Sequence, residues 1–120
     1  MILPFTITIP ASTNQREELA KEKIPEGVIT RIYIDIPSGW AYTAGIQIEV
    51  NGDLILPTPT KNEEFVTGDD TNLEFRIYKK VSEGELKIFG VNYDVNDHSC
   101  VIFVELLTKE ELKVLKEVGV

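Results

Sequence analysis

The alternation of apolar and polar residues predicts a chain that is built mainly from β-strands. Apolar side chains recur at alternate positions in residues 3–9, 28–36 and 73–81. A period of two is typical of a strand with one buried face. Residues 86–91 and 100–106 are also rich in β-branched and aromatic side chains, so we expect strands there as well.

Residues 45–57 predict a β-hairpin. Asn51-Gly52 suits a two-residue type I′ turn, because both central positions need positive φ. The expected register pairs Val50 with Asp53, Glu49 with Leu54, Ile48 with Ile55, Gln47 with Leu56 and Ile46 with Pro57. Leu54 and Leu56 then lie on one face of the hairpin and the isoleucines on the other, so both faces carry apolar side chains. We therefore expect one face to contact the core and the other to contact a second subunit.

Two segments depart from strand alternation. Residues 11–27 are polar and charged, and they predict a long connection that could contain a short helix at residues 15–21. Near the C-terminus, Thr108 and Glu111 form a capping box, which predicts a helix over residues 109–118. Its apolar stripe, which includes Leu112 and Leu115, could pack on its own sheet or on a neighbour.

This succession of short strands predicts a mainly β fold. Turn signals about every 8–12 residues, without β-α-β alternation, are typical of an antiparallel sandwich or barrel. We expect a jelly-roll-like β-sandwich with seven or eight strands within residues 2–106, followed by the short helix. A chain of 120 residues can bury one core without disulfides or metal, so a single domain over residues 1–120 is expected.

Charge and hydropathy narrow the function classes. A formal net charge of −8 repels phosphate backbones, so we expect no nucleic-acid partner. No apolar run approaches the roughly 20 residues of a membrane span, and the start lacks the features of a signal peptide. A cytoplasmic location is therefore expected from these features. Fourteen glutamates and nine lysines against two glutamines favour a thermophilic source.

Few residues offer catalytic chemistry. His98 is the only histidine, and Asp97 cannot orient it as in a triad merely by standing next to it. Cys100 lies in an apolar strand and is interpreted as a small buried hydrophobe. A hydrolase would need two carboxylates in one cleft, and no acidic run resembles a pocket wall. We expect no enzymatic activity, no cofactor and no resident metal.

Other residues are candidates for binding. The oxygens of Asp94, Asn96 and Asp97, joined by Asp69 and Asp70, could bind calcium, although ordinary turns use the same residues and that interpretation is favoured. The aromatic residues Trp40 and Tyr42 could stack on a sugar ring, or they could belong to the core or an interface. The ligand-binding candidates are Trp40, Tyr42, Asp94, Asn96, Asp97 and His98. The interface candidates are Tyr33, Leu54, Leu56, Tyr78, Leu112 and Leu115.

Several segments together resemble a family of small jelly-roll-like proteins from phage and archaeal proviral gene clusters. They are FTITIPAST at residues 5–13, EGVITRIYIDIPSGW at residues 26–40, Leu56-Pro57-Thr58, Thr67-Gly68-Asp69-Asp70, and Asn92-Tyr93-Asp94 leading to His98. The resemblance covers about residues 4–106, and the C-terminal helix departs from it.

The resemblance implies a structural role near a virus-like particle, such as a capsid decoration, spike or fibre module. Its expected partners are copies of itself, with a trimer as the expected oligomer, and capsid or other virion proteins. The alternative is a carbohydrate-binding or attachment module, which could depend on calcium.

Overall fold

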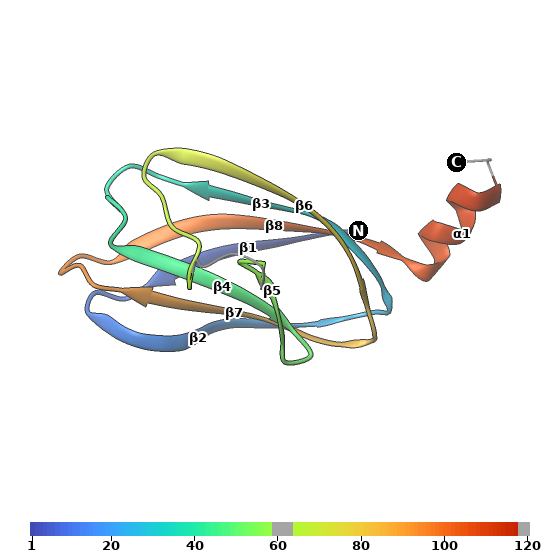
Figure 1. Cartoon of the computed structure of the whole chain (residues 1–120), viewed down its shortest axis with the longest axis horizontal. Coiled ribbons are helices and arrows are strands. Elements are labelled where there is room, and N and C mark those ends of the chain that lie inside the picture. The colour runs from blue at the N-terminus through green and yellow to red at the C-terminus, as the bar shows by residue number, and fades with distance from the viewer. Residues whose placement is uncertain (59–63, 118–120) are drawn as a thin grey trace.

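A computed structural model of the chain describes residues 1–58 and 64–117, which form eight strands and one helix (Figure 1). In chain order they are β1 (Ile2–Ile9), β2 (Thr13–Ile24), β3 (Gly27–Ile36), β4 (Ala44–Val50), β5 (Asp53–Leu56), β6 (Thr71–Val81), β7 (Gly84–Asn92), β8 (His98–Thr108) and α1 (Lys109–Glu117). Two antiparallel four-stranded sheets have the orders β1-β8-β3-β6 and β2-β7-β4-β5. The predicted β-sandwich is confirmed.

The strand order is that of one long antiparallel ribbon rolled into two sheets. β4 pairs with β5, β3 with β6, β2 with β7 and β1 with β8, so the pairs are nested around the Asn51-Gly52 turn. Rolling the ribbon places β8 beside β3 and β7 beside β4. This is the arrangement of an eight-stranded jelly roll. Asn51 and Gly52 have φ angles of 52° and 85°, as the type I′ turn requires.

The core between the sheets is rich in isoleucine. Ile32, Ile34 and Ile36 of β3 point inward and are fully buried, as alternation predicted. Cys100 of β8 is also buried, and this burial raises the pKa of its thiol to about 12. Cys100 therefore stays protonated and acts as a small apolar side chain.

Residues 11–27 are not the predicted connection, because most of them form β2, and residues 15–21 are extended, not helical. β2 is an edge strand that pairs with β7, so its many charged side chains remain in water. Two register shifts interrupt its alternation, which is why the sequence pattern did not reveal a strand. Leu19 and Ala20, next to the second shift, pack against the core.

Arg16 fixes this charged strand to the outer face of its sheet. Its guanidinium carbon lies 3.4 Å from the centroid of the Phe89 ring on β7, which is a cation–π contact. The same side chain donates a hydrogen bond to Gln47 Oε1 at 2.7 Å and forms an ion pair with Glu49, both on β4. One arginine thus spans three neighbouring strands.

A bulge changes the predicted hairpin register. The two pairs next to the turn form as expected, but Ile48 then pairs with Leu56 instead of Ile55. Because of the extra residue, Ile55 and Leu56 are both buried, and Leu56 is only 1% exposed. The assignment of Leu56 to an interface was therefore wrong. Leu54, the other hairpin candidate, is half-buried.

The capping box at the C-terminal helix is present. Thr108 Oγ1 accepts a hydrogen bond from Glu111 N–H, and Glu111 Oε1 accepts one from Thr108 N–H, both at 3.2 Å. Glu111 also binds the N-terminal ammonium of Met1 at 2.9 Å, and this contact lowers the pKa of its carboxyl. The helix projects beyond the sheets and covers neither of them (Figure 1). Residue 118 of the predicted helix lies outside the described residues.

Asn51 also joins its own turn to the β6–β7 turn. Its Oδ1 accepts a hydrogen bond from Glu85 N–H at 2.9 Å, and its Nδ2 donates one to Ser82 O at 3.3 Å. A side chain at Gly84 would collide with this amide. Two turns that are distant in sequence are therefore held together by one residue.

Asn51→Ala should lower the free energy of unfolding by about 1–3 kcal/mol, because it removes these bonds and strains a positive-φ position. Asn51→Gly should cost less, since it relieves the backbone and loses only the bonds. Urea denaturation measures both, with Asn72→Ala at an exposed strand position as the control. Equal stability of Asn51→Ala and Asn72→Ala would contradict the role of the turn.

Candidate functional site

Three loops meet at the end of the sandwich opposite α1, and we call this region the loop end (Figure 1). It contains residues 10–12, 37–43 and 93–97, together with residues 64–70 that precede β6. Backbone bonds connect the segments: Ser12 N–H donates to Asp94 O, and Tyr93 N–H donates to Thr43 O, both at 2.9 Å. Loops held on a rigid sheet scaffold are common positions for binding residues.

Asp69 organises the β3–β4 loop. Its Oδ1 accepts hydrogen bonds from the backbone N–H groups of Gly39 at 2.9 Å and Ala41 at 3.0 Å. The bonds from Ala41 and then Gly39 lower the pKa of the Asp69 carboxyl, because they favour its charged form. The carboxylate thus acts as an anchor for the loop backbone.

The anchored backbone exposes Tyr42. Ala41 and Tyr42 have φ angles of 45° and 63°, a left-handed conformation that is uncommon outside glycine. Thr43 stabilises it by donating from its N–H and its hydroxyl to Trp40 O, at 2.8 and 2.5 Å. The Tyr42 side chain is consequently 72% exposed. Strained backbone that several bonds maintain is a feature of binding and catalytic loops.

Trp40 is not a ligand platform, so this candidate is corrected. Its side chain is fully buried, and its indole N–H donates to Ser99 O at 2.9 Å. The ring centroid lies 6.3 Å from that of His98, at an angle of 46°. Trp40 therefore closes the core at the loop end, which was the other interpretation of this residue.

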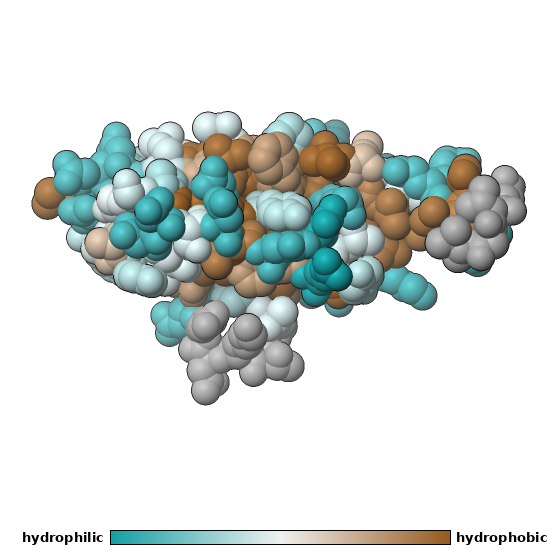
Figure 2. All heavy atoms as spheres, turned by 90° about the horizontal axis from the view of Figure 1, so that it is seen from above, coloured by the Kyte–Doolittle hydropathy of each residue, from teal (hydrophilic) through white to brown (hydrophobic). Residues whose placement is uncertain are grey.

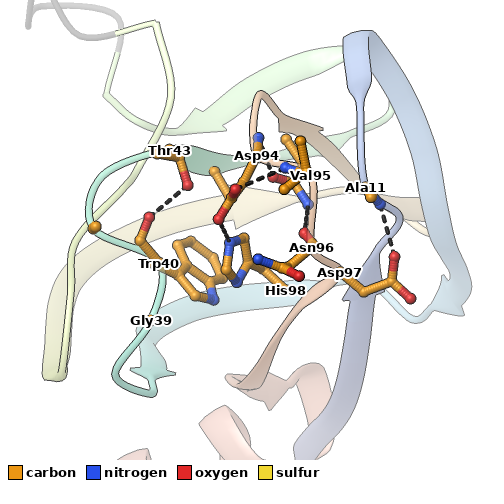
Figure 3. Close-up of polar contacts among 12 residues, drawn as sticks. Ala11, Gly39, Trp40, Thr43, Asp94, Val95, Asn96, Asp97 and His98 are labelled. Atoms are coloured by element: carbon orange, nitrogen blue, oxygen red, sulfur yellow. Dashed lines mark hydrogen bonds and ion pairs between the residues drawn. The ribbon is translucent and has the colours of Figure 1, made fainter.

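The β7–β8 loop is held by a carboxylate–histidine contact (Figure 3). Asp94 Oδ2 lies 2.8 Å from His98 Nε2, and Asp94 Oδ1 accepts from Val95 N–H at 2.7 Å. These contacts, with that of His98 first, lower the pKa of the Asp94 carboxyl. The buried Asn92 amide donates to Ile9 O at 3.0 Å and to Asn96 O at 2.9 Å. The loop tip thus has little freedom to move.

Three acidic residues of the loop end, Asp69, Asp94 and Asp97, serve as turn-forming groups. Asp97 Oδ1 accepts from Ala11 N–H at 2.8 Å, while Asp69 and Asp94 bind the amides described above. Throughout residues 1–58 and 64–117, no group of three or more histidine, cysteine, aspartate or glutamate side chains is placed to hold a metal ion. The geometry supports the turn interpretation of Asp94, Asn96 and Asp97.

A second exposed region lies on the outer face of the β1-β8-β3-β6 sheet. Phe103 of β8 pairs with Pro4 of β1 on one side and with Tyr33 of β3 on the other. Phe103 is 42% exposed and Tyr33 is 39% exposed, while Ile2 stands further along β1. We call Ile2, Pro4, Tyr33, Val101 and Phe103 the outer-sheet patch. Figure 2 shows hydrophobic residues in a band that runs toward the base of the helix.

Charged groups border the outer-sheet patch. Arg31 lies next to it, with its guanidinium carbon 5.2 Å from the Tyr33 ring centroid. Arg31 forms ion pairs with Glu105 at 3.0 Å and with Glu74 at 3.4 Å. The hydrogen bonds that Glu105 accepts from Thr30 and then from Arg31 lower the pKa of the Glu105 carboxyl. The patch therefore has an apolar centre and a polar rim on this side.

The four interface candidates outside the hairpin fall in three environments. Tyr33 belongs to the outer-sheet patch, whereas Tyr78 is 67% exposed at a bulge of β6 with a φ of 54°. Leu112 and Leu115 are half-buried on α1, away from both. The structure does not bring these residues together in one surface.

Sequence reasoning missed several exposed apolar residues, among them Ile2, Tyr93, Val95 and Phe103. Phe103 lies in the apolar strand predicted over residues 100–106, and its alternation with Ile102 and Val104, which are fully buried, could have revealed that it is exposed. Tyr93 and Val95 lie at the loop end and are exposed. Only their position in a polar loop could have indicated this.

No protein-family model and no curated protein sequence matches this chain. Within the described residues, no helix is long and apolar enough to cross a membrane. The loop end and the outer-sheet patch are therefore the features from which function must be inferred.

The Asp69 anchor makes stability depend on pH. The pKa of the Asp69 carboxyl is lowered in the folded chain, so its ionised form stabilises the fold. This contribution to the free energy of unfolding is complete above the pKa of the unfolded chain, about 3.9, and is lost as the pH falls through the lower pKa of the folded chain. Asp69→Asn cannot ionise. We expect the stability difference between wild type and Asp69→Asn to be constant near neutral pH and to shrink below about pH 4.

Urea titrations over a series of pH values measure this difference. Asp70→Asn is the control, because no side-chain hydrogen bond of Asp70 is present within the described residues. A difference that grows on acidification would contradict the anchoring role.

Proposed function

We propose that this protein is a non-enzymatic structural component of a virus or provirus-derived particle that associates with copies of itself through the outer-sheet patch. The observation that carries the proposal is the row of Pro4, Phe103 and Tyr33 on an exposed sheet face. Single exposed apolar residues are ordinary, but a contiguous group with a polar rim is typical of a protein interface.

The chemistry of the patch suits self-association. Aromatic side chains bury a large area with few rotatable bonds, and they dominate the energy of many interfaces. Neighbouring strands hold Phe103 and Tyr33 at fixed positions, so little ordering is required on binding. Arg31 and its glutamates at the border can exclude water or pair with a second copy.

Two further observations support a structural role in a virus or provirus-derived particle. The jelly-roll strand order is shared by many viral capsid and lectin domains, although a fold by itself assigns no function. The sequence segments described above resemble proviral proteins of this class. A closed ring of three copies is the assembly we expect, with other virion proteins as its partners.

Phe103→Ser should weaken self-association by about 10–100-fold, because an exposed aromatic residue contributes about 1.5–3 kcal/mol when it is buried. Sedimentation velocity over a micromolar concentration series measures the change. Val95→Ser is the control, because Val95 is 81% exposed at the loop end, away from the patch. A wild-type chain that remains monomeric at high micromolar concentration would refute self-association.

The alternative function is attachment to a carbohydrate through the loop end. The observation that favours it is the pair of exposed tyrosines, Tyr42 and Tyr93, on loops that are held by Asp69 and Asp94. Aromatic rings fixed in this way can stack on the apolar face of a sugar.

Tyr42→Ala should abolish retention on a glycan array without unfolding the chain if the loop end binds carbohydrate. Tyr78→Ala is a close control, since Tyr78 is 67% exposed and also has positive φ, but lies on β6. Trp40→Ala cannot serve, because that residue belongs to the core. Failure of the wild-type chain to bind any glycan on the array would eliminate the alternative.

A further inference from the structure

An open groove separates α1 from the end of the β1-β8-β3-β6 sheet. It has a volume of about 730 Å³, and its apolar lining is formed by Val28 of β3 and by Leu112 and Leu115 of α1. A smaller hollow of about 330 Å³ continues from Val28 and Leu112 toward the β2–β3 and β6–β7 turns. Volumes of this order are usual for ligand pockets, roughly 300–1,000 Å³.

Lysines surround this apolar lining. Lys80 of β6 and Lys109, Lys113 and Lys116 of α1 all border the groove and are exposed. Among the described side chains, Glu110 is the one acid that lines the main groove, and Glu26 lines the smaller hollow. The chain as a whole has a net charge of −8, so a cluster of four lysines is unusual for it. In contrast, Lys21 and Lys87 on the opposite sheet lie within 4 Å of glutamates.

We propose that this groove binds an acidic amphipathic segment of a partner protein. Apolar side chains of the segment would contact Val28, Leu112 and Leu115, and its carboxylates would meet the lysines at the rim. Charge complementarity of this kind selects partners and accelerates their association. An amphipathic helix that lays its apolar face in a groove is a common mode of peptide recognition.

Other occupants fit the groove less well. If two copies placed the same groove against each other, their lysines would face one another and repel. A flat bilayer could not follow a hollow between a helix and a sheet. The acidic segment is the occupant that satisfies both the shape and the charge.

The test uses the full chain and two labelled synthetic peptides. Both peptides carry leucines along one helical face, but one has glutamates on the other face and its match has lysines. Fluorescence anisotropy should show binding of the glutamate peptide, weakening as ionic strength rises, and no binding of the lysine peptide. Lys113→Glu/Lys116→Glu should weaken binding at least about tenfold.

Three further variants separate binding in the groove from a general effect of charge. Lys21→Glu/Lys23→Glu changes the net charge by the same amount on β2 and should leave the affinity unchanged. Lys80→Glu should weaken binding without altering α1, because Lys80 lies on β6. Leu115→Ser should also weaken it.

Several outcomes would overturn the proposal. They are failure of the glutamate peptide to bind, an equal loss in the two double variants, and unchanged binding in Lys80→Glu. Two other occupants have their own signatures, each of which would also overturn the proposal. If the glutamate peptide does not bind and Lys113→Glu/Lys116→Glu abolishes binding to phosphatidylserine-containing vesicles, the groove contacts a membrane surface. If the glutamate peptide does not bind and the same double variant abolishes self-association in sedimentation, the groove contacts a neighbouring copy of the chain.

Discussion

The nested pairing of strands around the Asn51-Gly52 turn is the constraint on which the other features depend. Each strand pair encloses the one before it, so the register set at this turn is carried outward through β3–β6 and β2–β7 to β1–β8. Because side chains alternate between the two faces of a strand, a one-residue shift in the pairing register would place the isoleucines of the core on the solvent-facing side. Where one strand has an extra residue relative to its partner, a β-bulge accommodates it, as on β5 and at Thr30 of β3. Outward positions such as those of Phe103 and Tyr33 are fixed by the same pairing.

Much of this architecture could be predicted, because its signals are local. The alternation in residues 28–36, the Asn-Gly turn and the Thr108–Glu111 capping box each specify a conformation through nearby residues alone. The strand β2 could not be predicted in this way. Its charges suit an edge strand, but that edge exists only after β7 has paired with it, and its register shifts interrupt the periodic pattern.

The candidate sites were less predictable, because burial depends on where the chain turns. Trp40 and Tyr42 are almost adjacent and similar in chemistry, yet one is fully buried and the other is mostly exposed. The positive φ values of Ala41 and Tyr42 produce this difference, and they depend on a carboxylate 28 residues away in sequence. Leu56 is a similar case, since the bulge that buries it has no marker in the sequence.

The strand edges show why association through a face suits this molecule better than sheet extension. β1 carries Pro4, β2 is densely charged, β5 has only four residues, and β6 has a bulge at Tyr78. Each of these features opposes the addition of another strand, so copies cannot readily join edge to edge. Contacts are then left to sheet faces and to the two ends of the sandwich. A contact at the outer-sheet patch would leave the loop end accessible, so that one surface could hold copies together while another reached a ligand.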